Sequence, residues 1–160
     1  MAYYNMAETE KRIAKVREIL RAKNLDAALI YFDELNVANG WYLTGWVGQF
    51  EKGAVLVGRD GTTMLLGGPE SEPFAKQSSA IHDTRCFKVF MVPDEEYPLA
   101  TIIGFEELFA ELNVLGRKGN KERNGISSVR YHADGRNDGF VYLLGASCPL
   151  AAVESFKRTD

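Results

Sequence analysis

The hydrophobic positions near the N-terminus have the spacing of a helix. One apolar stripe predicts an amphipathic helix over residues 7–23, and it consists of Ile13, Val16, Ile19 and Leu20. Asn5, three residues before Glu8, has the spacing of a capping box. Asn24 can end the helix in a left-handed conformation. This pattern predicts a surface helix that packs one face on a sheet.

The apolar runs that follow are short and predict strands. Residues 27–31 are apolar without alternation, as expected of a central strand that is covered on both faces. Two further runs, over 54–57 and 63–66, flank the sequence Arg59-Asp60-Gly61. An Asp-Gly pair between apolar runs is a strong hairpin signal, because both positions tolerate a positive φ. Part of the sheet is therefore predicted to be antiparallel.

The rest of the chain alternates helical, strand-like and polar segments. A short helix is expected within residues 33–39, with loops around Gly40 and Gly45. Later in the chain we expect a helix over 70–79, a strand within 84–92, a helix over 104–112, a polar loop over 116–125, a strand over 126–130, a helix over 138–144 and a strand near 150–153. This alternation, with its hairpin, predicts an α/β fold: a three-layer α/β/α domain with a mixed sheet.

The segment Tyr42-Leu43-Thr44-Gly45 lies between the first two predicted strands. The order of helix, strand, Tyr-Leu-Thr-Gly and strand resembles the N-terminal domain of the creatinase, prolidase and aminopeptidase P family of metallohydrolases. The resemblance is good over residues 12–92, continues to about residue 112, and rests beyond Gly116 on the order of elements. It implies a ribonuclease-H-like domain over residues 1–153, with residues 154–160 beginning a linker to a C-terminal catalytic domain.

In that family the N-terminal domain is not the catalytic one. The catalytic domain has a pita-bread fold; in the peptidases it binds two metal ions through two Asp, one His and two Glu, whereas creatinases work without metal. The resemblance therefore implies no catalytic residue, no metal ligand and no cofactor in this chain. A pair of Mn, Co or Zn ions would belong to the catalytic domain of an Xaa-Pro aminopeptidase or dipeptidase. The implied partners are that domain and a second subunit in a homodimer.

The residues that carry chemistry form no motif of a self-contained active site. Cys86 and Cys148 are far apart and lack the spacing of metal ligands, which favours buried free thiols. His82 is paired only with the adjacent Asp83, and this favours surface polar residues over a metal site. The polar residues 131–138 fit a turn that leads into a capped helix. A metal or phosphate site there, in a small independent hydrolase, is the weaker alternative.

Aromatic residues gather between the first two predicted strands: Trp41, Tyr42, Trp46 and Phe50. Two interpretations are open. Either the rings cover one end of the sheet, or some of them remain exposed as a contact surface. The resemblance favours the second, because this domain commonly contacts the partner subunit in the family and its loops can border the neighbouring active site. Asp33 and Glu34 are further candidates for such a loop, against a plain solvated loop.

Composition and charge limit the classes of partner that the chain can bind. The chain has 160 residues, of which 46% are hydrophobic, and 19 basic against 22 acidic residues give a net charge of -3. This balance argues against nucleic acid as a partner. No apolar run approaches the roughly 20 residues that span a bilayer, and the N-terminus lacks a secretory signal, so we expect a cytoplasmic protein. The alternative from another class is a stand-alone α/β module that binds a protein or small ligand through the aromatic segment.

Overall fold

The computed structural model describes residues 5–48, 51–91, 97 and 100–112, and the backbone of 125–133 and 137–145. Its strands are β1 (Ala27–Phe32), β2 (Gly53–Gly58), β3 (Thr63–Gly67), β4 (Thr84–Phe87), β5 (Ile102–Ile103), β6 (Gly125–Ala133) and β7 (Asn137–Gly145). They form one seven-stranded sheet in the order β5-β4-β3-β2-β1-β7-β6.

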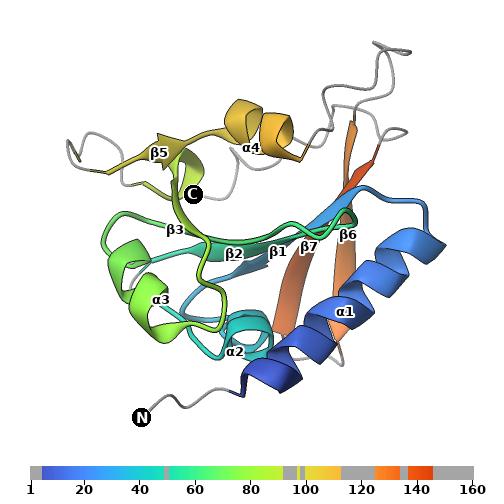
Figure 1. The fold of residues 1–160 in the computed structure, drawn as a ribbon, viewed down its shortest axis with the longest axis horizontal. Coiled ribbons are helices and arrows are strands. Elements are labelled where there is room, and N and C mark those ends of the chain that lie inside the picture. Colours follow the sequence, from blue (N-terminus) through green and yellow to red (C-terminus); the bar gives the residue numbers. More distant parts are fainter. Residues whose placement is uncertain are drawn as a thin grey trace.

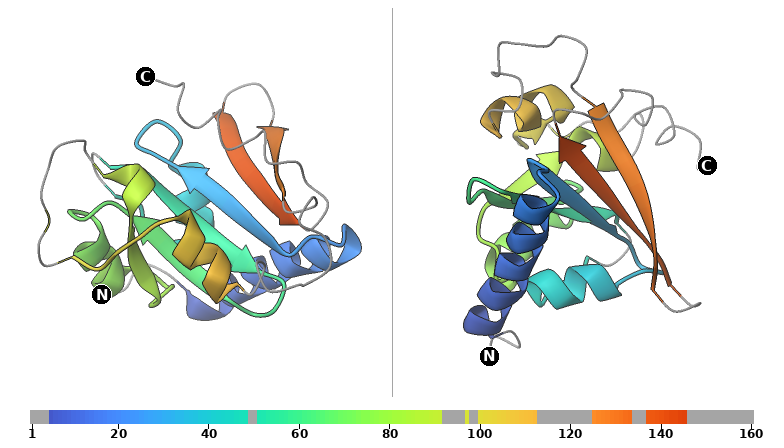
Figure 2. Two further views of the ribbon diagram at one scale, coloured as in Figure 1. Left: turned by 90° about the horizontal axis from the view of Figure 1, so that it is seen from above. Right: turned by 90° about the vertical axis from the view of Figure 1, so that its right-hand side faces the viewer.

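Helices cover both faces of this sheet. Figure 1 shows α1 (Met6–Ala22), α2 (Ala38–Thr44) and α3 (Glu72–Ser78) on one face and α4 (Phe105–Glu111) on the other. The views in Figure 2 show α1 running diagonally across its face. The predicted α/β class, with helical layers on both sides of a mixed sheet, is confirmed.

Helix α1 begins and ends as its sequence predicts, but Ile19, which was expected on the apolar stripe that packs on the sheet, is exposed. The side chain of Asn5 accepts a hydrogen bond from the Glu8 N–H at 3.3 Å. Asn24 has a φ of 51°, and the next N–H, of Leu25, donates to the Leu20 carbonyl at 2.9 Å. This bond closes a left-handed helix cap, in which an Asn avoids most of the strain that other side chains would suffer.

The sheet combines an antiparallel centre with a parallel edge. Strand β2 pairs antiparallel with β1 and β3, and the pair Val57 and Thr63 closes the predicted β2–β3 hairpin. Strands β3, β4 and β5 are parallel, with α3 as the crossover between β3 and β4. On its other side β1 pairs antiparallel with β7, which pairs with β6.

Side chains that alternate along the central strands build two cores. Leu29, Leu56 and Leu66 contribute to the core beneath α4. Ile30, Val55 and Leu65 belong to the core beneath α1, α2 and α3. Because successive residues of a strand point to opposite faces, a continuous apolar run serves both cores at once.

The segment predicted as a helix over 138–144 is strand β7, so that prediction is wrong. Asn137–Gly145 pairs with β6 in a hairpin and with β1 along its other edge, where Ala27 is opposite Leu144. The sequence of Phe140, Val141 and Tyr142 suits a strand, since aromatic and β-branched residues favour sheets. Of the turn predicted within 131–138, residues 131–133 belong to β6 and residues 137–138 to β7, and residues 134–136 lie outside the described residues.

The short helix is also displaced from its predicted place. It was expected within residues 33–39, and it occupies Ala38–Thr44. The two-residue strand β5 was not predicted at all. The polar loop after Gly116, the strand near 150–153, Cys148 and the linker over 154–160 lie outside the described residues. Among the helices of the described part, none combines the length and apolarity that crossing a membrane requires.

Candidate interaction surface at helix α2

The Tyr-Leu-Thr-Gly segment forms the last turn and C-cap of α2, where the sequence predicted a loop. Gly45 is the C-cap residue, with a φ of 65°, and its N–H donates to the Trp41 carbonyl at 2.9 Å. Glycine adopts this left-handed conformation without the steric cost of a Cβ atom. Leu43 is buried in the core beneath α1, α2 and α3. The segment therefore ends a helix and anchors it to the sheet.

Thr44 is fully buried and ties this helix end to its surroundings. Its Oγ1 accepts a hydrogen bond from the Trp46 N–H at 2.9 Å and lies 2.7 Å from the carbonyl oxygens of Gly40 and Trp46. The Thr44 carbonyl accepts a hydrogen bond from the Ala80 N–H at 2.8 Å. One threonine thus joins α2, the chain that follows it and the segment before β4. These bonds give the Tyr-Leu-Thr-Gly segment a structural role.

Gly40 lets α2 lie directly on the sheet. A Cβ atom at this position would come within 2.8 Å of the Phe32 ring and 2.9 Å of a Val47 methyl group. Real Cβ atoms do not approach other carbons this closely, because repulsion rises steeply inside van der Waals contact. Any larger residue would push the helix away from β1, so this glycine fixes the orientation of the opposite, outward side of α2.

Large apolar side chains are exposed on the outward side of α2 and in the turn before it. Leu35 is 86% exposed, Trp41 54%, Tyr42 50% and Val37 41%. Val37 and Trp41 lie one helical turn apart, and the Trp41 N–H donates to the Val37 carbonyl at 2.9 Å. We call these four residues the α2 apolar surface. Exposed apolar groups gathered in one region are typical of a protein contact.

Arg12 of α1 holds the Tyr42 end of this surface in place. Its guanidinium carbon lies 4.4 Å from the centre of the Tyr42 ring, and its Nη1 donates to the Tyr42 carbonyl at 2.8 Å. Its Nε also donates to the Glu8 carboxylate at 3.2 Å. A cation above a ring is an attractive contact. Tyr42 is therefore oriented before any partner arrives, which lowers the entropy lost on binding.

The acidic candidates from the sequence have different places. Asp33 is half-buried and shapes the turn after β1, because its carboxylate accepts hydrogen bonds from the Leu35 N–H at 3.0 Å and the Asn36 N–H at 2.8 Å. It also accepts from the Tyr31 hydroxyl at 2.9 Å. These bonds start a turn where a helix was expected. Glu34 is exposed beside Leu35.

The aromatic candidates divide into exposed and partly buried residues. Trp41 and Tyr42 belong to the α2 apolar surface, whereas Trp46 is partly buried and packs against the core beneath α1, α2 and α3. Phe50 lies outside the described residues. The structure thus brings two of the four aromatic candidates together on an exposed surface and turns Trp46 towards the interior.

Comparison with known families gives the chain its place. A family model described as the creatinase/prolidase N-terminal domain matches residues 12–128, which is more than half of the 160-residue chain. The chain belongs to the creatinase/prolidase N-terminal domain family. A search of curated proteins finds no match. The matched range of this creatinase/prolidase N-terminal domain includes the whole α2 apolar surface, and it confirms the resemblance that the sequence suggested.

Sequence reasoning missed two members of the α2 apolar surface of this creatinase/prolidase N-terminal domain. Leu35 and Val37 are isolated apolar residues in the polar stretch from Asp33 to Asn39. Two residues apart, they would lie on different sides of a helix and give no periodic signal. The available signal was that Val37 and Trp41 are four residues apart, which places them one turn apart on a helix. This signal could be used only if α2 was placed correctly.

The other residues that could take part in catalysis or metal binding are dispersed in this domain. His82 is exposed and Cys86 is buried, as the sequence predicted for Cys86. Burial raises the pKa of the Cys86 thiol, and the carboxylates of Glu72 and Glu51 raise it further, so the thiol is protonated at neutral pH. Within the described residues, no three His, Cys, Asp or Glu side chains come close enough together to hold a metal ion.

Proposed function

We propose that this chain is the non-catalytic N-terminal domain of an Xaa-Pro aminopeptidase or dipeptidase-like metallohydrolase, and that the α2 apolar surface contacts the partner subunit. The observation that carries the proposal is this surface, which lies within the matched range of a family of enzyme N-terminal domains. The domain would form the subunit interface and border the approach to an active site in the catalytic domain.

The geometry of the α2 apolar surface supports a contact role. Gly40 allows the helix to lie against β1, and Arg12 contacts both the ring and the carbonyl of Tyr42, so two points of the surface are held by the rest of the domain. Aromatic anchors that enter a desolvated pocket contribute about 2 kcal/mol or more of association energy each. Trp41 is the strongest anchor candidate, because it is the largest side chain of the four.

An activity comparison tests the proposed division of labour. The 160-residue chain and the complete protein are assayed side by side with Mn, Co or Zn, using a dipeptide with proline in second place and creatine as substrates. We expect the complete protein to cleave the Xaa-Pro peptide and the chain to cleave neither substrate. The groups that polarise a carbonyl and activate water would belong to the catalytic domain.

Three results would decide against parts of this proposal. Metal-dependent hydrolysis by the 160-residue chain would overturn its non-catalytic role. Cleavage of creatine in place of the peptide would assign the parent enzyme to the creatinase-like amidinohydrolases. A complete protein with neither activity would favour the alternative, an α/β module that binds another protein through the α2 apolar surface.

A further inference from the structure

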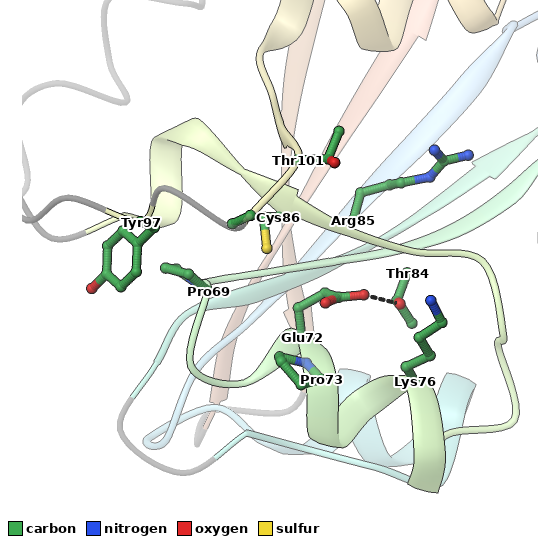
Figure 3. Close-up of a pocket in the computed structure, with 10 residues that line it drawn as sticks. Pro69, Glu72, Pro73, Lys76, Thr84, Arg85, Cys86, Tyr97 and Thr101 are labelled. Atoms are coloured by element: carbon green, nitrogen blue, oxygen red, sulfur yellow. Dashed lines mark hydrogen bonds between the residues drawn. The ribbon is translucent and has the colours of Figure 1, made fainter.

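A cavity of about 630 Å³ lies at the parallel edge of the sheet, far from α2 along the chain (Figure 3). Its walls come from α3 and the turn before it, from β4, and from the segment that precedes β5. The volume is within the range of about 300–1,000 Å³ that is usual for small-ligand sites. Cys86, which lines the cavity, is opposite Gly67, the last residue of β3.

The walls of this cavity combine apolar or aromatic residues with polar and charged ones. Pro69 and Pro73 line one side, and Tyr97 and Ala100 line another. Proline rings and a tyrosine ring offer flat, rigid surfaces to the carbon part of a ligand. A tyrosine face also attracts a cation that lies against it.

Glu72 is the acidic residue among those that line the cavity, and Lys76 and Arg85 are the basic ones. Glu72, half-buried on α3, accepts a hydrogen bond from the Thr84 hydroxyl of β4, and Figure 3 shows its carboxylate and the Cys86 sulfur pointing into the space between these elements. The Glu51 carboxylate is held near this turn by the Ser71 N–H at 2.6 Å. Both carboxylates raise the pKa of the Cys86 thiol, which is the effect of a negative potential at that point.

The two basic residues at the cavity, Arg85 and Lys76, differ in their surroundings. Arg85 donates to Asp83 at 2.7 Å and lies 3.7 Å from the Glu111 carboxylate, so two acidic groups balance its charge. Lys76 is exposed on α3, one turn after Glu72. Its ammonium group would repel a bound cation. Removing this group therefore tests whether the ligand is positively charged.

We propose that this cavity binds a small organic cation, with the Glu72 carboxylate as counter-ion for an alkylammonium or guanidinium group. The carbon part of the ligand would lie against the proline rings and Tyr97. The site is separate from the α2 apolar surface, and it neither requires nor excludes a subunit contact there.

The test uses a matched pair of probes, n-butylammonium and n-butyrate, titrated into the isotope-labelled chain and followed by amide NMR shifts. We expect saturable shifts at Thr84, Cys86 and Thr101 with the ammonium probe and none with the carboxylate probe. Glu72→Gln keeps an oxygen for the Thr84 hydroxyl and should weaken binding at least about tenfold. Glu70→Gln removes the same charge from an exposed neighbour and should change it little.

Lys76→Gln gives a second, opposite prediction at an exposed position that folding does not require. It should tighten ammonium binding severalfold, because it removes a like charge from the rim. The proposal would be overturned by the absence of a saturable shift with the ammonium probe, by stronger binding of butyrate, or by weaker ammonium binding in Lys76→Gln. Equal affinities of Glu72→Gln and the wild type would also overturn it.

Discussion

Aromatic residues have opposite surroundings in two regions of this domain. Beneath and on α4, Phe87 packs edge-on against Phe105 with ring centres 5.0 Å apart, and Phe105 stacks on Phe109 at 5.6 Å. Around α2, Trp41 and Tyr42 are about half exposed. The rings on and beneath α4 pack against one another within the chain. The rings of α2 retain exposed apolar area that a second molecule can cover. The contrast separates aromatic residues that hold the fold from those that suit a contact.

The sharpest way to test this contrast is to remove one ring from the α4 region. Phe87→Ala should lower the free energy of unfolding by about 3–5 kcal/mol, because it deletes a fully buried ring and leaves a cavity. Urea denaturation measures the loss. Phe74→Ala, at an exposed position on α3, is the matched control and should cost about 0.5 kcal/mol or less. Similar losses for both variants would contradict the assignment of Phe87 to a core.

A smaller loss is expected where α2 ends. Thr44→Val keeps the shape of the side chain and removes its hydroxyl, so the free energy of unfolding should fall by about 1–3 kcal/mol. The Trp46 N–H would lose its acceptor in a part-buried setting. Thr44→Ser, which keeps the hydroxyl, is the control and should retain most of the stability. If Thr44→Val were as stable as the wild type, the hydroxyl would not be what holds this helix end.

Local signals predicted most of the fold, and the main errors concern strands β7 and β5. Helix α1, strands β1 to β3 and helix α4 follow from periodicity, caps and an Asp-Gly turn. Strand β7 was mistaken for a helix, although it forms a hairpin with the neighbouring β6; its other edge pairs with β1, more than one hundred residues earlier in the chain. Strand β5 has two residues and leaves no periodic signal.

The candidate surface was only partly predictable for a related reason. Aromatic density indicated the right segment, but exposure depends on the rotation of α2, and that rotation is fixed by Gly40 against Phe32 and by the cap at Gly45. The sequence therefore could not separate the outward Trp41 from the partly buried Trp46. Leu35 was missed because the turn built by Asp33 was read as a helix.

The smallest expected effect is a pH dependence at the start of α4. Hydrogen bonds from its own backbone N–H and from the Gly104 N–H lower the pKa of Glu107, and the Gly104 bond measures 2.9 Å. A lowered pKa in the folded state stabilises the domain above the ordinary pKa of Glu107, and this contribution disappears as the pH falls through the folded value. Between about pH 7 and about pH 3, the free energy of unfolding should fall slightly more for the wild type than for Glu107→Gln. Urea denaturation at each pH measures this difference. An equal loss in both would refute the cap.

The most direct test of the central claim is the association of the complete protein, measured by sedimentation equilibrium for the wild type, Trp41→Ala and Ile19→Ala. Ile19 is an exposed apolar residue on α1, outside the α2 apolar surface, and serves as the control. We expect Trp41→Ala to weaken subunit association by about 2 kcal/mol, roughly thirtyfold in Kd, while its unfolding free energy and the association of Ile19→Ala stay near the wild-type values. Unchanged association of Trp41→Ala would contradict the claim that the α2 apolar surface is a subunit contact.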